Sequence, residues 1–208
     1  MRKMILTIAA ILAVSSAVLS AGESGKPSVG AGAVKSKAGK KAPEFKLKNY
    51  DGKMVSLSDY KGKIVVLEWY NYECPFVKHH YEKLNTMVNL ADKYKAKNVV
   101  WLAINSTSHL TTEKNKEFAE EHKVSYPMLD DRSGKVGRAY KARTTPHIFI
   151  INTEGMIVFD GAIDNSPLGR RKKGVINYVD KALGELTSGK KISISRTKPY
   201  GCTVKYAN

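Results

Sequence analysis

Hydrophobic and polar positions along the chain change their period several times, which predicts a domain built from both strands and helices. Residues 63–69 and 98–105 are nearly continuous apolar runs, as expected of strands that are covered on both faces. Residues 75–95 and 112–123 instead repeat apolar positions at helical spacing. The order of these segments predicts an α/β fold with a mixed central sheet and helices on both faces.

Shorter elements are expected on either side of these segments. Residues 42–57 alternate apolar and polar positions around an Asp-Gly turn, which predicts an N-terminal β-hairpin. A second hairpin is predicted for residues 148–159, around the Asn-Thr-Glu-Gly turn. The remaining predictions are a short strand at 126–129, a helical turn at 136–140, a helix at 174–186 and an irregular tail from Lys190 onward.

The first 21 residues have the pattern of a secretory signal peptide. A basic start at Arg2 and Lys3 is followed by an apolar stretch and then by small residues. The apolar stretch is short for a membrane span, although an uncleaved N-terminal anchor is an alternative. Residues 22–41 contain five glycines and five lysines without periodicity, which predicts a flexible linker. We therefore expect an exported protein, periplasmic or extracellular, with a domain at 42–189 and a tail at 190–208.

The charge balance narrows the expected partners. The chain has 35 Lys and Arg residues against 19 Asp and Glu residues, a formal net charge of +16, and the loss of Arg2 and Lys3 with the signal peptide leaves +14. The basic residues are scattered rather than gathered in one stripe, which argues against nucleic acid as a partner. In an exported protein this charge favours peripheral attraction to anionic envelope surfaces.

Cys74 is the main candidate for chemistry. It follows the predicted strand at 63–69 and directly precedes Pro75, a residue that suits the first turn of a helix. Unpaired amides and the helix dipole at such a position favour thiolate over thiol. An inert buried cysteine is the alternative. Glu73 next to it, and Val77 where a Cys-x-x-Cys motif has its second cysteine, predict a milder thiol than in strong oxidants.

Glu68 and Cys202 are two further candidates for the same chemistry. Glu68 lies inside an apolar strand, where desolvation would raise its pKa and allow proton transfer to or from Cys74 or a leaving sulfur. Alternatively, Glu68 reaches water at the strand end. Cys202 lies in the irregular tail, where a cysteine has little packing role. It is a thiol that resolves oxidised Cys74, one half of a permanent staple, or a free distal thiol.

Two other features stand out near the predicted second hairpin and the first helix. Thr145-Pro146 opens a strand, where proline is unfavourable unless it makes a special turn. His147 follows it, and His79 and His80 follow Cys74, so a metal site is a further alternative. The histidine pair is a weak signal, because adjacent residues on a helix cannot both face the thiol.

Taken together, these residues resemble the peroxiredoxin-like branch of the redoxin group (alkyl hydroperoxide reductase and thiol-specific antioxidant) in the thioredoxin superfamily. The matching stretches cover nearly all of 42–206: 42–57, ECPFVK at 73–78, WLAINS at 101–106, TTPHIFIIN at 144–152, DGAIDNSP at 160–167 and YGCTVKY at 200–206. The resemblance implies a thioredoxin-like fold. It places Cys74 at the peroxidatic or first thioredoxin cysteine, Thr145-Pro146 at the cis-proline, and Glu68 at the buried acid of thioredoxins.

The chain also departs from the peroxiredoxin pattern. Leu67 and Asn71 stand where peroxiredoxins have proline and a threonine or serine before the thiol. Their peroxide-activating arginine aligns near Pro146, and Arg143 is the nearest candidate. These departures count against efficient peroxide reduction.

The sequence thus predicts an exported thiol oxidoreductase whose Cys74 attacks a protein disulfide or a peroxide. Cys202 would resolve the intermediate, and Thr145, Pro146 and Arg143 would contact the substrate. No cofactor is expected, but an external thiol reductant is required. The alternatives are a non-catalytic thioredoxin-like module of the cell envelope that binds a metal or a protein, and a structural envelope protein with a permanent disulfide.

Overall fold

The computed structural model describes residues 38–207, so the predicted signal peptide and most of the predicted linker lie outside the described residues. The first described residues already hydrogen-bond to residues 155–157, at the start of strand β8 (Ile157–Gly161). The Gly39 amide donates to the Ile157 carbonyl at 2.7 Å, and the Ala42 amide donates to the Gly155 carbonyl at 2.9 Å. Across this range, none of the helices has the length and apolar character needed to cross a membrane.

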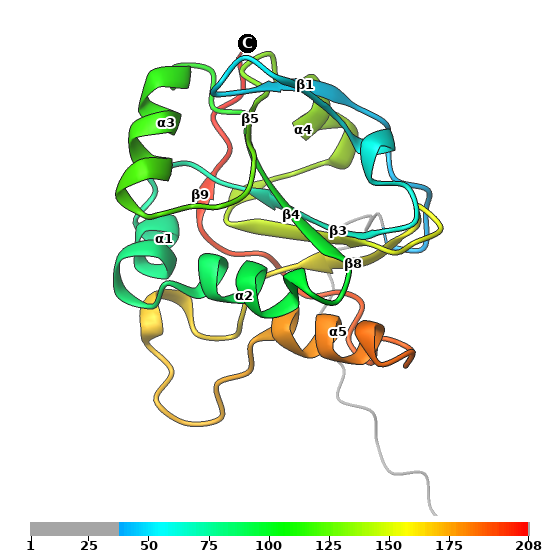
Figure 1. Cartoon of the computed structure of the whole chain (residues 1–208). Coiled ribbons are helices and arrows are strands. Elements are labelled where there is room, and N and C mark those ends of the chain that lie inside the picture. Colours follow the sequence, from blue (N-terminus) through cyan, green and yellow to red (C-terminus); the bar gives the residue numbers. More distant parts are fainter. Residues whose placement is uncertain (1–37, 208) are drawn as a thin grey trace, which may run out of the picture. The chain divides into compact units, whose positions relative to one another are not determined.

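A seven-stranded mixed sheet forms the centre of the domain, with the strand order β2-β1-β5-β4-β3-β7-β8 (Figure 1). Strand β3 pairs in parallel with β4 and antiparallel with β7, and the two predicted hairpins are present as β1–β2 and β7–β8. The strands are β1 (Lys46–Asn49), β2 (Met54–Ser56), β3 (Ile64–Trp69), β4 (Val99–Asn105), β5 (Met128–Asp130), β7 (His147–Ile151) and β8 (Ile157–Gly161). This sheet confirms the predicted thioredoxin-like α/β architecture.

Helices cover both faces of the sheet, as the continuous apolar runs of β3 and β4 require. Val66 and its neighbours pack on the face that contacts α1, α2, α3 and α5, whereas Val65 and Leu67 pack on the face that contacts α4. The helical elements are η1 (Leu57–Tyr60), α1 (Pro75–Lys78), the π-helical segment η2 (His79–Lys83), α2 (Thr86–Lys95), α3 (Thr112–Glu121), α4 (Lys135–Tyr140), η3 (Pro167–Gly169) and α5 (Tyr178–Thr187).

The prediction of a single helix at 75–95 is wrong for the middle of this range. The chain passes from α1 into η2, and then breaks at Asn85, which has a left-handed backbone with φ of 48°. A π-helical segment adds a residue to the turn and rotates the side chains that follow. Leu84, which the helical period places on the apolar face, is consequently 50% exposed.

The predicted helix at 174–186 begins later than expected. Gly174 has φ of +64°, and the Asn177 side chain accepts a hydrogen bond from the Asp180 amide as the cap of α5. Val175, which falls within the range predicted for this helix, is therefore in the preceding loop and 54% exposed.

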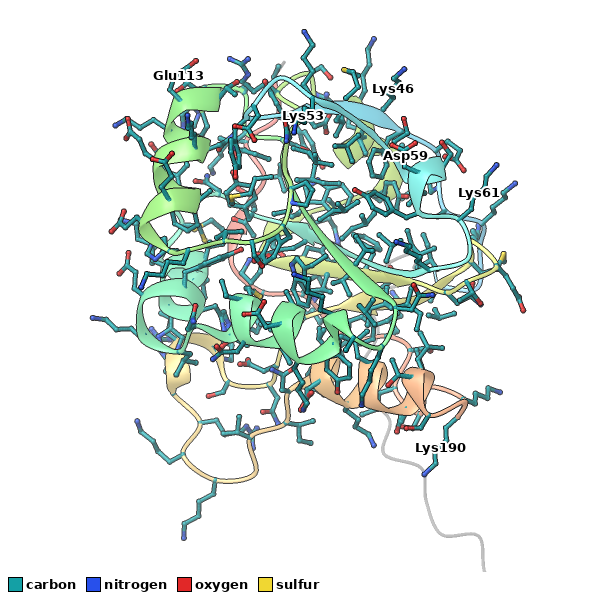
Figure 2. The ribbon with its side chains drawn as sticks, in the orientation of Figure 1. Lys46, Lys53, Asp59, Lys61, Glu113 and Lys190 are labelled. Atoms are coloured by element: carbon teal, nitrogen blue, oxygen red, sulfur yellow. The ribbon has the colours of Figure 1, made fainter. Side chains whose placement is uncertain are left out.

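Much of the charge is carried on side chains that point to solvent. Lys46, Lys61 and Lys190 project outward from three separate parts of the domain (Figure 2). This spread agrees with the scattered distribution of basic residues along the sequence.

Candidate active site

The C-terminal segment, residues 190–207, crosses the domain and brings the second cysteine to the first. Figure 1 shows this segment in red, running past α1 toward the C-terminus. Its strand β9 (Cys202–Thr203) pairs antiparallel with β6 (Thr144–Thr145), so that Cys202 lies opposite Thr145 and Thr203 opposite Thr144. The tail predicted as irregular therefore contains one short strand, and that strand carries Cys202.

Cys74 occupies the predicted position between strand and helix. It caps α1 with an extended backbone, and Pro75 is the first residue of that helix. The thiol is buried, with 2% of the residue exposed, and it donates to the Thr145 carbonyl at a sulfur–oxygen distance of 3.0 Å. The Thr145-Pro146 peptide bond is cis, as the resemblance implied. Cys74, Thr145 and Cys202 thus meet at one point.

Both cysteines are free thiols, and their surroundings separate their acidities. Burial raises the pKa of Cys74, but hydrogen bonds from Thr145 and Cys202 and from the Cys202 and Val77 amides outweigh it, so its pKa lies below the ordinary 9.0. Apart from its effect on the Cys74 sulfur, the buried Thr145 hydroxyl has no hydrogen-bond partner. Burial and the contact with Cys74 raise the pKa of Cys202 to about 11. The pair is therefore one thiol that favours ionisation and one that resists it.

Gly201 makes the close contact between the two strands possible. A side-chain carbon at this position would lie 1.9 Å from the Thr145 carbonyl oxygen, and the backbone has φ of +121°. Only glycine combines this φ with so close an approach to another backbone. Gly201 therefore fixes how near β9, and with it Cys202, can lie to Thr145.

We expect Gly201→Ala to displace β9 from β6 and to expose Cys74. Gly155→Ala is the matched control, because Gly155 also has a positive φ of 78° but nothing lies within 4 Å of the added carbon. In urea unfolding, Gly201→Ala should lose about 1 kcal/mol or more beyond the loss in the control, the usual cost of overpacking. Cys74 of the reduced protein should also react faster with iodoacetamide. Equal alkylation rates in the two variants would contradict this assignment.

Glu68 is completely buried, so the alternative that it reaches water at the strand end is wrong and the expected desolvation of its carboxyl is present. Its carboxylate accepts hydrogen bonds from the Trp101 indole at 2.9 Å and from the Tyr81 hydroxyl at 3.0 and 3.1 Å. Burial raises its pKa to about 7, although both hydrogen bonds act in the opposite direction. No hydrogen bond joins Glu68 to Cys74, so proton transfer between them stays a prediction.

The other candidate residues lie near the cis-proline but do not contact the thiol. The side chain of Arg143 is exposed, and its guanidinium makes no hydrogen bond to Cys74. His147 is buried, accepts from the Arg143 amide at 3.3 Å, and lies 2.8 Å from an Asp160 carboxylate oxygen. Both imidazole nitrogens of His147 are thus hydrogen-bonded, one to the backbone of Arg143 and one to the side chain of Asp160, which indicates a structural role.

The metal-site alternative finds no support in the arrangement of the histidines. Within residues 38–207, no three His, Cys, Asp or Glu side chains are placed to hold a metal ion. Nε2 of His80 lies 2.8 Å from the Tyr200 hydroxyl. Tyr200 in turn donates to Asp164 at 2.7 Å. In the sequence, Asp164 and Tyr200 stand out only as parts of matching stretches, and His80 only as a possible metal ligand, because no local pattern links positions 120 and 36 residues apart.

The chain is similar to known proteins in both sequence and structure. The family model AhpC/TSA matches residues 38–159. The chain is 29% identical over 124 residues to the thiol-disulfide oxidoreductase ResA of Bacillus thuringiensis, covering 60% of this chain and 69% of that protein. An uncharacterized conserved protein from Geobacillus kaustophilus has a similar structure, with a TM-score of 0.75, 32% identity and coverage of 82% and 92% of the two chains. A putative thiol:disulfide interchange protein DsbE from Chlorobium tepidum follows with a TM-score of 0.53, 26% identity and coverage of 61% and 85%.

Proposed function

Because the chain belongs to the AhpC/TSA family, we propose that it is a thiol oxidoreductase that exchanges disulfides through Cys74, with Cys202 as the resolving thiol. The observation that carries the proposal is the strand pairing that sets Cys202 opposite Thr145. The carbonyl of the same Thr145 accepts a hydrogen bond from the Cys74 thiol. Relatives named as thiol-disulfide oxidoreductase and thiol:disulfide interchange protein support this chemistry over the binding and structural alternatives.

The proposed reaction moves two electrons from the enzyme to a substrate disulfide. The Cys74 thiolate attacks one sulfur of the substrate, the substrate S–S bond breaks, and the departing thiolate takes a proton from solvent. Cys202 then releases its proton to solvent, and the resulting thiolate attacks the Cys74 sulfur of this mixed disulfide. The second substrate thiolate leaves and takes up a proton. The enzyme is left with a Cys74–Cys202 disulfide, which an external dithiol reduces to restore both thiols.

The acidities of the two thiols suit these steps. Cys74, with the lowered pKa, is ionised more readily and is also the better leaving group when the enzyme disulfide is reduced. The raised pKa of Cys202 keeps it protonated in the reduced enzyme, so the resting nucleophile is Cys74.

Peroxide reduction is the less favoured use of the same thiol. A peroxidase must polarise the O–O bond with donors placed around the sulfur. Arg143 is exposed and does not bond to Cys74, and Asn71 uses its side-chain oxygen to accept the Glu73 amide at 2.7 Å. Neither Arg143 nor Asn71, which stand near or at the peroxiredoxin positions, is therefore a donor to the Cys74 sulfur.

Export is part of the proposal and rests on the N-terminal sequence. Residues 1–21 have the basic, apolar and small-residue order of a signal peptide. Outside the cytoplasm, a Cys74–Cys202 disulfide is permitted to persist until a reductant reaches it. The substrates would then be disulfides of envelope proteins.

The fully reduced protein, treated with oxidised glutathione and quenched in acid, tests the proposal. By mass spectrometry, the wild-type chain should acquire a Cys74–Cys202 disulfide, whereas Cys202→Ser should stop with one glutathione on Cys74. Hydrogen peroxide should react with Cys74 no faster than with a free thiol. Fast peroxide oxidation would make the protein a peroxidase instead, and the absence of any glutathione adduct would reject thiol exchange.

A further inference from the structure

Two buried polar side chains and a half-buried tyrosine attach the segment that carries Cys202 to the helical path that follows Cys74. The Tyr200 hydroxyl lies 2.8 Å from His80 Nε2 and donates to the Asp164 carboxylate at 2.7 Å. His80 is fully buried, and its Nδ1 lies 3.2 Å from the Thr86 hydroxyl. We call Tyr200, His80 and Asp164 the tyrosine clasp.

Each hydrogen bond of the clasp has one consistent direction. Burial lowers the pKa of His80 to about 4, although Asp164 acts in the opposite direction, so His80 is neutral near neutral pH. Neutral His80 with its proton on Nε2 donates to Tyr200 and accepts from Thr86 at Nδ1. The Tyr200 hydroxyl then donates its hydrogen bond to the Asp164 carboxylate. A buried network with every partner satisfied is rigid, and it is disrupted when one member is removed.

The tyrosine also packs against the first turn of the active-site helix. Its ring lies 5.8 Å from the Phe76 ring and is stacked at 6.4 Å on the His80 ring, measured between centroids. Phe76 and His80 belong to the continuous helical path that starts after Cys74, in α1 and η2. Tyr200 is only two residues before Cys202 along the chain, so the clasp fixes one end of β9 relative to the thiol it must meet.

From this geometry we propose that the tyrosine clasp positions Cys202 for reaction with Cys74. The inference rests on the proposed function and adds Tyr200, His80 and Asp164 as positioning residues, which do not touch the reacting sulfurs. Without the clasp, β9 would be held by its two-residue pairing with β6 and by contacts further along the segment. The Cys202 sulfur would then spend less time beside Cys74, and its effective concentration there would fall.

Tyr200→Phe is the test, because it removes both hydrogen bonds and keeps the ring. The effective concentration of Cys202 is measured by equilibrating the protein with reduced and oxidised glutathione and quantifying the Cys74–Cys202 disulfide. It should fall about tenfold to a hundredfold, the range for losing a hydrogen bond to a charged acceptor. Cys74 should meanwhile react faster with iodoacetamide.

Tyr94→Phe is the matched control. Tyr94 also donates to a carboxylate, Asp180, at 2.7 Å, but it joins α2 to α5 rather than the C-terminal segment to α1. Tyr94→Phe should lower the unfolding free energy about as much as Tyr200→Phe does, but leave the effective concentration of Cys202 and the alkylation rate of Cys74 unchanged. Asp164→Asn serves as a second test variant if Tyr200→Phe does not fold, and we expect the same two changes at smaller size.

The outcomes separate the inference from the proposed function. A wild-type protein that exchanges with glutathione, together with a Tyr200→Phe variant of unchanged effective concentration, would overturn the clasp alone. A wild-type protein that forms neither a glutathione adduct nor the Cys74–Cys202 disulfide would overturn the proposed function. Equal changes in Tyr200→Phe and Tyr94→Phe would show a general loss of stability and would also reject the clasp.

Discussion

Replacement of Cys74 by serine will reduce the rate of disulfide exchange about a thousandfold or more. A hydroxyl has far too high a pKa to ionise as this thiol does, and removal of a nucleophile has effects of this size in other enzymes. The fold should persist, because serine is smaller than cysteine and can still donate to the Thr145 carbonyl that now accepts the thiol. The measurement is single-turnover reduction of a disulfide-bonded peptide by the fully reduced protein, after the external dithiol has been removed.

Cys202→Ser is the control that makes this result specific. It keeps the Cys74 thiolate, so the first step, formation of the mixed disulfide, should proceed while release of the second substrate thiol stops. Cys202 contributes a hydrogen bond that favours the Cys74 thiolate, so the first step should also slow modestly. If Cys74→Ser kept wild-type exchange while Cys202→Ser lost it, Cys202 would be the nucleophile and the roles proposed for the two thiols would be reversed.

The sequence predicts the parts of this site that depend on local pattern. Continuous apolar runs correctly locate β3 and β4, and Cys74 before Pro75 correctly marks the junction of strand and helix. These predictions succeed because the local sequence is enough to set hydrophobic period and helix-start chemistry. The cis geometry of Thr145-Pro146 followed from the family resemblance rather than from any local signal.

Other parts of the site depend on contacts that no local pattern encodes. The docking of the C-terminal segment needs Gly201 to approach Thr145 and Tyr200 to reach His80, residues far apart in the sequence. The break of the long helix at Asn85 was also missed, since the apolar spacing continues through Leu84. In both cases tertiary packing overrides or adds to the local preference.

The buried acid Glu68 lowers the stability of the fold at neutral pH, and its replacement should reveal how much. The pKa of this carboxyl is about 7 in the folded protein, against 4.5 when it is solvated in the unfolded chain. Below pH 4.5 the carboxyl is protonated in both states and contributes no pH dependence. As the pH rises from 4.5 to 7, the unfolded chain loses this proton first, so stability falls by about 3 kcal/mol and then levels off.

Glu68→Gln removes this titration while keeping an oxygen that can accept from Trp101 and an amide that can donate to Tyr81. The quantity to measure is the unfolding free energy of the variant minus that of wild type, both in urea. We expect this difference to be about 3 kcal/mol larger at pH 8 than at pH 4. Glu117→Gln, at an exposed position on α3, is the control and should show little of this change. A difference between Glu68→Gln and wild type that stays constant from pH 4 to pH 8 would mean that Glu68 does not titrate in this range, and that the hydrogen bonds from Trp101 and Tyr81 hold it ionised despite its burial.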